Sequence, residues 1–365
     1  MNNTLLYQIA LTLIPGIGCV QARCLLEHFT AEEIFKAKKS SLEKIEGIGT
    51  LRINNIKSFN DYTTAEKEIA FIEKYKIQPL FITDDAYPKR LLNCYDPPTL
   101  LYYRGNANLN QSKIVAIVGS RTHTDYGKQI TEALIEKLSD TGTLIISGLA
   151  YGIDAVAHKA SLKNKVETVG VLAHGLDKIY PFSHSEMAKE MIKQGGLLTE
   201  FRTKTKPDRY NFPSRNRIVA GMSDATIVIE TEVKGGSMIT AELANGYNKD
   251  VFAFPGKTTD KKSSGCNHLI KNNKAILLTD AAQLLETMGW VERKTPVKKK
   301  AKELFTHLTS DEKIIVDLLN EKHLLSIDDI NLLSGLSSSA VAVALLNLEL
   351  HYIIQSLPGK QYKLL

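Results

Sequence analysis

Glycines, small polar residues and cations gather at several points of the sequence where an apolar run ends. Gly119-Ser120-Arg121 follows one such run, and Ser147-Gly148 follows another, with Gly152 shortly after it. Lys178 comes after a third run, and Gly235-Gly236-Ser237 comes after a fourth, shortly before Thr240. Glycines leave the backbone N–H groups at a helix start open to a phosphate, and the cations add charge. The pattern predicts a sugar-phosphate ligand, either a nucleotide or a polynucleotide.

Aromatic side chains near these points favour the same kind of ligand, because bases stack on flat rings. The aromatic residues concerned are Tyr126, Tyr151, Tyr180 and Phe212.

Three arginines are candidates for the phosphate contact. Arg121 is the best placed, because it lies three residues after the end of an expected parallel strand. Arg215 and Arg217 flank Asn216. We expect one of these two to face the ligand and the other to form an ion pair with Glu230 or Glu200, but their spacing alone does not say which.

No catalytic or metal-binding group stands out. Asp154 and His158 lie four residues apart, as acid–base partners on a helix would, but an N-cap and a buried histidine explain this spacing better. The four cysteines form no Cys-x-x-Cys pair, so we expect no structural zinc. Pro255-Gly256-Lys257-Thr258 ends like a phosphate-binding loop, but Val251 stands where the first glycine should be. We therefore expect no metal, no nucleotide cofactor and no enzymatic activity.

Alternating strands and helices must position these residues. Apolar runs at 114–118, 144–147, 168–172, 226–229 and 251–254 predict buried parallel strands, with amphipathic segments between most of them. Repeated strand–helix units predict an α/β fold with an extended Rossmann-like parallel sheet. Ligands bind beyond the carboxyl ends of such strands, where the residues above are expected.

The 365 residues are too many for one ordinary domain. Residues 1–62 contain two Gly-Ile-Gly turns and resemble a helical helix-hairpin-helix/SAM-like domain. We expect the Rossmann-like domain over 63–289, a basic linker over 290–304 and a winged-helix-like domain over 305–365. In 306–365, four lysines stand against seven acidic residues, and the third helix of that domain has no basic residue. We therefore expect this domain to be a protein-contact or regulatory module rather than a DNA-binding one.

The composition, with 43% hydrophobic and 24% charged residues, is that of a globular protein. A net charge of +6 is compatible with nucleic acid without requiring it. Neither a membrane span nor a secretory signal is expected, and the low cysteine content favours the cytoplasm.

Seven motifs in order, from about Tyr87 to Leu278, resemble the DprA/Smf family of bacterial DNA-processing proteins. They are Val118-Gly119-Ser120-Arg121, Tyr126-Gly127, Ser147–Ala150 with Gly152-Ile153-Asp154 and Ala157-His158, Tyr180-Pro181, Phe212–Arg217, Gly236–Ala241 and Pro255-Gly256. The resemblance implies a protein that binds and protects single-stranded DNA and loads the RecA recombinase during natural transformation. It also implies a homodimer formed through the Rossmann core.

Carried over to this sequence, the resemblance implies a single-stranded-DNA site made of residues in six short segments. These are Gly119, Ser120, Arg121, Thr124, Tyr126, Gly127, Ser147, Gly148, Gly152, Lys178, Arg215, Asn216, Arg217, Gly235, Gly236, Ser237 and Thr240. Three positions depart from the family pattern. Tyr151 and Phe182 stand where relatives often have a basic residue, and Gly235 stands where the family usually has a serine.

Two other functions stay open at this point. Gly235-Gly236 with Thr240 and Glu242 is similar to a motif of phosphoribohydrolase-like enzymes, although the spacing is one residue longer and the third glycine is missing. A nucleotide-processing enzyme is therefore the main alternative. A protein adaptor is the third reading, but it would not explain glycine loops and arginines at strand ends.

Overall fold

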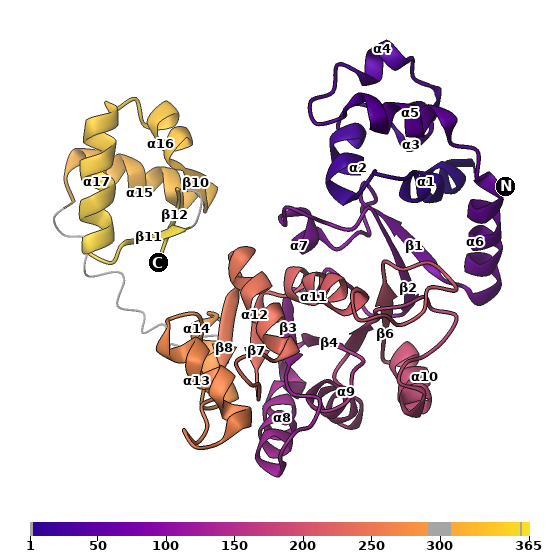
Figure 1. Ribbon diagram of the computed structural model, residues 1–365. Helices are drawn as coiled ribbons and strands as arrows, with labels where there is room; N and C mark the ends of the chain where they lie inside the picture. The colour runs from indigo at the N-terminus through magenta and orange to yellow at the C-terminus, as the bar shows by residue number, and fades with distance from the viewer. Residues whose placement is uncertain (1–2, 291–307, 358–359) are drawn as a thin grey trace. The chain divides into compact units, whose positions relative to one another are not determined.

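A nine-stranded sheet forms the centre of the first of two units (Figure 1). The computed structural model describes residues 3–290, 308–357 and 360–365, and it divides into units of residues 1–290 and 291–365. The sheet order is β1-β2-β6-β5-β4-β3-β7-β8-β9. The strands are β1 Gln78–Phe81, β2 Leu100–Gly105, β3 Lys113–Val118, β4 Thr143–Gly148, β5 Thr168–Val171, β6 Gly195–Thr199, β7 Ala225–Val228, β8 Asp250–Ala253 and β9 Ile276–Leu277.

Seven of these strands, from β6 to β9 in the sheet order, run parallel. The edge strand β1 pairs antiparallel with β2, with Leu80 opposite Leu101, and β2 pairs antiparallel with β6. Strands β3 to β6 extend to one side of β3, whereas β7 lies on its other side. The strand order therefore reverses next to β3, which is the point where open α/β sheets bind ligands.

Helices cover both faces of the sheet, which explains why its central strands are apolar without alternation. Val115, Ile117 and Ile145 pack with α8 Asp125–Leu138, α9 Ile153–Lys163 and α14 Ala281–Thr287. The alternate residues Ile114, Ala116 and Ile146 pack with α11 Asn211–Met222, α12 Gly236–Gly246 and α13 Ser264–Lys271. Two further helices, α7 Lys89–Leu92 and α10 Ser185–Lys193, complete this part of the unit.

The N-terminal helices contain the two expected helix–hairpin–helix units. They are α1 Asn3–Leu13, α2 Cys19–Leu26, α3 Ala31–Lys36, α4 Lys39–Leu42, α5 Thr50–Ser58 and α6 Tyr62–Tyr75. Gly16 and Gly47 adopt positive φ angles of 79° and 82° in the two hairpins, a conformation that glycine accommodates without strain. Arg52 ties the hairpins together, because its Nε donates to the Gly16 carbonyl at 3.1 Å and its Nη1 to the Gly47 carbonyl at 3.0 Å. Arg52, the arginine beside the second hairpin, therefore has a structural role.

Buried residues of these helices and of the sheet belong to one hydrophobic cluster that includes Ile9, Ile53, Leu101 and Ile114. The boundary between residues 62 and 63 therefore stays a prediction, since the core runs across it. The predicted basic linker lies outside the described residues from 291 onward.

The second unit has its own core and is a winged-helix domain, as predicted. Its elements are α15 Ser310–Lys322, β10 Leu325–Ser326, α16 Ile327–Ser334, α17 Ser338–Leu350, β11 Ile354–Leu357 and β12 Gln361–Leu364. Ile315, Leu319, Val341 and Leu348 form the centre of the core.

Among the described residues, no single helix is long and apolar enough to cross a membrane. Helices α16 and α17 reach that length and hydropathy only as a pair bent by 118°.

Candidate nucleic-acid interface

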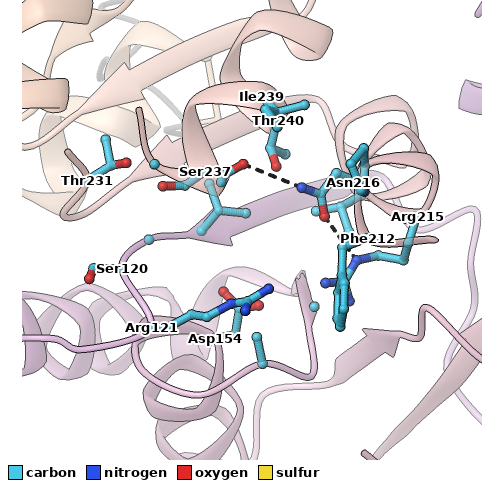
Figure 2. Close-up of a pocket in the computed structure, with 18 of the residues that line it drawn as sticks. Ser120, Arg121, Asp154, Phe212, Arg215, Asn216, Thr231, Ser237, Ile239 and Thr240 are labelled. Carbon is cyan, nitrogen blue, oxygen red and sulfur yellow. Dashed lines mark hydrogen bonds between the residues drawn. The ribbon is translucent and has the colours of Figure 1, made fainter. Parts of the chain in front are cut away.

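A cavity of about 1020 Å³ opens where the strand order reverses (Figure 2). The loops that follow β3, β4 and β7 line it, together with the first turns of α11 and α12. Gly119, Ser120, Arg121, Gly148, Lys178, Arg215, Asn216, Gly235, Gly236, Ser237 and Thr240 are the predicted site residues that line this cavity. The structure therefore brings together residues that are more than 100 positions apart in the sequence.

The loop that carries Arg121 is held against the start of α9. Gly152 has a φ of +82°, and a Cβ built on it would lie 2.0 Å from the Ser120 carbonyl oxygen. The backbone N–H of Ile153 donates to that same oxygen at 3.1 Å. Only a glycine permits this close approach. Gly152 thus positions Arg121, whose guanidinium carbon lies 5.0 Å from the ring centroid of Phe212.

A buried arginine and a buried carboxylate lie at the floor of the cavity. Arg215 is 5% exposed, its Nη1 donates to the Val171 carbonyl and its Nε donates to Asn216 Oδ1 at 3.0 Å. Asp154 is 7% exposed, and a Cβ at Gly148 would lie 2.4 Å from its Oδ2 and 2.6 Å from Arg215 Nη1. Gly148 therefore leaves the space that these two groups fill.

Burial and charge act in opposite directions on this pair. Burial raises the pKa of Asp154, and the cations Arg215 and Arg121 partly offset that rise. Burial likewise lowers the pKa of Arg215, which Asp154 opposes. Each charge thus stabilises the other.

The start of α12 forms another wall of the cavity. A Cβ at Gly236 would meet open space, so the backbone at this position is accessible. The Nδ2 of Asn216 donates to the Gly236 carbonyl at 3.5 Å, as the dashed line in Figure 2 shows. The N-terminus of this 11-residue helix carries a partial positive charge that favours an anion.

Three cations of the cavity were missed by the sequence analysis. Lys206 and Arg209 come from the loop between β6 and α11, and Lys234 comes from the loop before α12. The signal was present, because Arg202, Lys204, Lys206 and Arg209 lie within eight residues. In total six cationic side chains line the cavity against the two carboxylates of Asp154 and Glu232. A multiply charged anion is the ligand that this arrangement attracts.

Comparisons with known proteins give the family. Residues 78–289 match the family model described as DNA recombination-mediator protein A, and residues 299–360 match the DprA winged helix domain. The chain belongs to the DprA family. This confirms the resemblance to DprA/Smf proteins.

Several relatives cover most of the chain. The chain is 36% identical to Protein Smf of Synechocystis sp., over 79% of this chain and 73% of that protein. It is 35% identical to DNA processing protein DprA of Streptococcus pneumoniae, over 70% of this chain and 97% of that one.

Two solved structures are similar. That of DNA processing protein A from Streptococcus pneumoniae superposes with a TM-score of 0.68 at 33% identity, covering 77% of this chain and 97% of that one. The structure of DNA processing protein A from Helicobacter pylori, described for its single-stranded DNA binding mode, gives a TM-score of 0.53 at 31% identity, over 58% and 95%.

Several other residues predicted for the site do not line the cavity of this DprA-family chain, and each has a visible structural role. Thr124 caps α8 and donates to Glu230, which also packs against Gly127. The Tyr126 hydroxyl donates to the Pro255 carbonyl at 2.8 Å, and the Ser147 hydroxyl to the Ile117 carbonyl at 2.6 Å. Gly152 does not line the cavity either; it packs against the Ser120 carbonyl and so positions the loop that carries Arg121.

Arg217 also lies outside the cavity lining. Its Nη2 forms an ion pair with Glu200, and its Nε lies 3.9 Å from Asp96 Oδ2. Arg215 and Arg217 are two residues apart on α11, so they point to different sides of the helix. The contact of Arg217 with DNA stays a prediction that this geometry does not favour.

The residues considered for catalysis have structural partners in this DprA-family fold. His158 is fully buried, with Nδ1 2.7 Å from Thr168 Oγ1 and Nε2 3.1 Å from the Gly148 carbonyl. Burial lowers its pKa to about 4. Glu242 lies 3.9 Å from Lys274 and does not line the cavity. No group of three His, Cys, Asp or Glu residues in the described ranges could hold a metal ion.

Proposed function

We propose that this chain binds single-stranded DNA in the cavity at the carboxyl ends of β3, β4 and β7. We further propose that it acts there as a recombination mediator, which protects incoming single strands and loads RecA during natural transformation. The observation that carries the proposal is the excess of cations around a cavity that also presents the rings of Phe212 and Tyr180. Cations suit the phosphates, and rings suit unpaired bases.

The size and position of the cavity support a single strand rather than a duplex. Its volume of about 1020 Å³ lies at the upper end of pockets that take small ligands, so it accommodates splayed nucleotides. A duplex would need a helix or ribbon to enter a groove, with cations on it to neutralise phosphates. The cavity is concave, so it presents no protruding helix or ribbon that could enter a groove.

The alternative, a nucleotide-processing enzyme, has less support. It requires a general acid or base that reaches the ligand. His158 has both ring nitrogens engaged, and Asp154 lies beside Arg215 at the cavity floor. Glu242, the acidic residue of the phosphoribohydrolase-like motif, lies near Lys274 instead.

We propose a protein-contact role for the winged-helix domain. Helix α17 exposes Val343 by 60%, Leu346 by 58% and Leu350 by 66%, at spacings that place them on one helix face. A DNA-reading helix would carry phosphate-neutralising cations there. Homodimer formation through the Rossmann core and RecA as a partner are proposals that follow from family membership. Sedimentation and a RecA nucleation assay on single-stranded DNA would test them.

One pair of assays separates the proposed functions. The full chain is titrated with fluorescent oligo-dT and with a duplex of equal length at physiological salt, and nucleoside monophosphates are assayed for hydrolysis. Preference for oligo-dT without hydrolysis supports the recombination mediator. Equal affinity for both DNAs would contradict the single-strand site, and turnover of a monophosphate would favour the enzyme.

A further inference from the structure

Two segments at the edge of the cavity expose aromatic rings: Tyr151 in one, and Tyr180, which also lines the cavity, with Phe182 two residues later in the other. Tyr151 is 51% exposed, Tyr180 is 48% exposed and Phe182 is 85% exposed. Large rings left in water are costly, so an exposed aromatic cluster indicates a binding surface. This aromatic cluster adjoins the cationic cavity.

The cluster is continuous with the cavity. A second, small hollow is lined by Tyr151 and Tyr180, and it shares Arg121, Phe212 and Arg215 with the main cavity. The ring of Tyr180 lies 6.4 Å from the ring of Phe212, centroid to centroid. A DNA strand that leaves the cavity past Phe212 therefore reaches the ring of Tyr180 next.

Local contacts fix the Tyr151 ring in place and hold the segment that follows Phe182 against it. The Tyr151 ring packs edge-on against the His184 ring at 5.2 Å, and the Ser183 hydroxyl donates to the Tyr151 hydroxyl at 3.5 Å. His184 is buried, with Nδ1 3.1 Å from the Leu149 carbonyl. A ring that is already ordered loses little conformational entropy when a base stacks on it.

The second hollow has a volume of only about 30 Å³, room for about one water molecule. A base cannot enter it. Bases on this surface must therefore lie flat against the rings, while the nearby cations Arg121 and Lys178 hold the phosphates.

We propose that Tyr151, Tyr180 and Phe182 form a second base-stacking subsite, which binds the nucleotide next to those in the cavity. This inference rests on the proposed function, because it assumes that single-stranded DNA occupies the cavity. The subsite adds affinity through stacking and neutralises no phosphate itself, so its contribution does not depend on salt.

The test compares two ligands with equal phosphates, an oligo-dT of about eight nucleotides and a fully abasic strand of the same length. Wild type is expected to prefer oligo-dT. The double variant Tyr151→Ala/Phe182→Ala should bind oligo-dT at least about fivefold more weakly, the equivalent of 1 kcal/mol. Its affinity for the abasic strand and its salt slope should stay those of wild type. Phe182→Trp should keep the affinity, and its fluorescence should be quenched by oligo-dT.

Tyr352→Ala is the matched control, because Tyr352 is 84% exposed and belongs to the second unit. If wild type does not bind oligo-dT at all, the proposed function fails. If wild type binds and the double variant binds oligo-dT as tightly as wild type does, only the second subsite is wrong. Unchanged DNA binding with an altered oligomeric state would also overturn it, since the rings would then contact a second copy.

Discussion

The guanidinium of Arg121 lies over the ring of Phe212, 5.0 Å from its centroid. The two residues come from the loop after β3 and from the first turn of α11, and both line the cavity. A cation stacked on a ring is oriented by it, and the pair presents a charge and a flat face side by side. This is the combination that a phosphate and its base require.

Phe212→Leu should weaken binding of oligo-dT by about fivefold to 150-fold, because base–aromatic stacking contributes about 1–3 kcal/mol. Phe212→Tyr should bind like wild type, since it keeps the ring. Fluorescence anisotropy measures both. If the leucine variant is folded and binds like wild type, no base stacks on this ring.

Arg217→Ala should destabilise the fold by about 3 kcal/mol and change oligo-dT affinity less than threefold. The substitution leaves Glu200 and Asp96 without their cation, at side-chain exposures of 17% and 21%. Denaturant unfolding checks the stability, and the double variant Arg217→Leu/Glu200→Leu should recover part of it. A large loss of DNA affinity in the folded Arg217→Ala protein would show that this arginine does contact DNA.

His158 should make the fold less stable in acid. Its pKa falls to about 4 in the fold, from 6.5 in the unfolded chain, so the unfolded state binds the proton first as the pH drops. The stability that comes from keeping His158 neutral is complete above pH 6.5 and is lost as the pH falls toward 4. Between pH 7 and pH 5 the loss is about 2 kcal/mol.

The measurement for His158 is the difference in unfolding free energy between wild type and His158→Gln at each pH. That difference removes the contributions of other titrating groups, such as Asp154 and Glu200, whose pKa values burial raises. The difference should shrink as the pH falls from 7 to 5. A constant difference would mean that His158 does not titrate in this way.

Deleting residues 304–365 should leave oligo-dT affinity within about threefold, or 0.7 kcal/mol. The winged-helix domain has a separate core, and residues 1–290 form a compact unit of their own. Its third helix, α17, carries no lysine or arginine. A tenfold loss on truncation, with the first unit still folded, would show that the winged helix holds DNA.

The strands at the centre of the sheet could be predicted because they are buried on both faces. Ile114–Val118 and Leu144–Ile146 are unbroken apolar runs, and they lie within β3 and β4. Strand β6 was missed because it begins with Gly195-Gly196, which is typical of a turn. Gly195 has a φ of 149°, and a Cβ there would lie 1.9 Å from the Thr168 carbonyl oxygen, so glycine is required for close strand packing.

The site could be predicted only in part, because side-chain direction is set by the fold. The glycine loops and Arg121 could be predicted as site residues because they come directly after predicted strands. The choice between Arg215 and Arg217 depended on knowing that both lie on a helix, α11, which begins at Asn211. Pro213 lies in the first turn of this helix, where its missing N–H group costs no backbone hydrogen bond. Lys206 and Arg209 lie on a loop without periodicity, and only the tertiary fold brings them to the cavity.

Whether the cavity holds the phosphates of single-stranded DNA is tested most directly by the salt dependence of DNA binding in the Arg121→Ala variant. The charge-matched control is Lys137→Ala, an exposed lysine in the last turn of α8 that does not line the cavity. The slope of log K against log salt is about −0.7 per phosphate neutralised. Arg121→Ala should weaken the binding of all DNA sequences alike, and its slope should be shallower by about 0.7, the value for one phosphate. Lys137→Ala should keep the wild-type slope. A folded Arg121→Ala protein with wild-type affinity and slope would contradict the account.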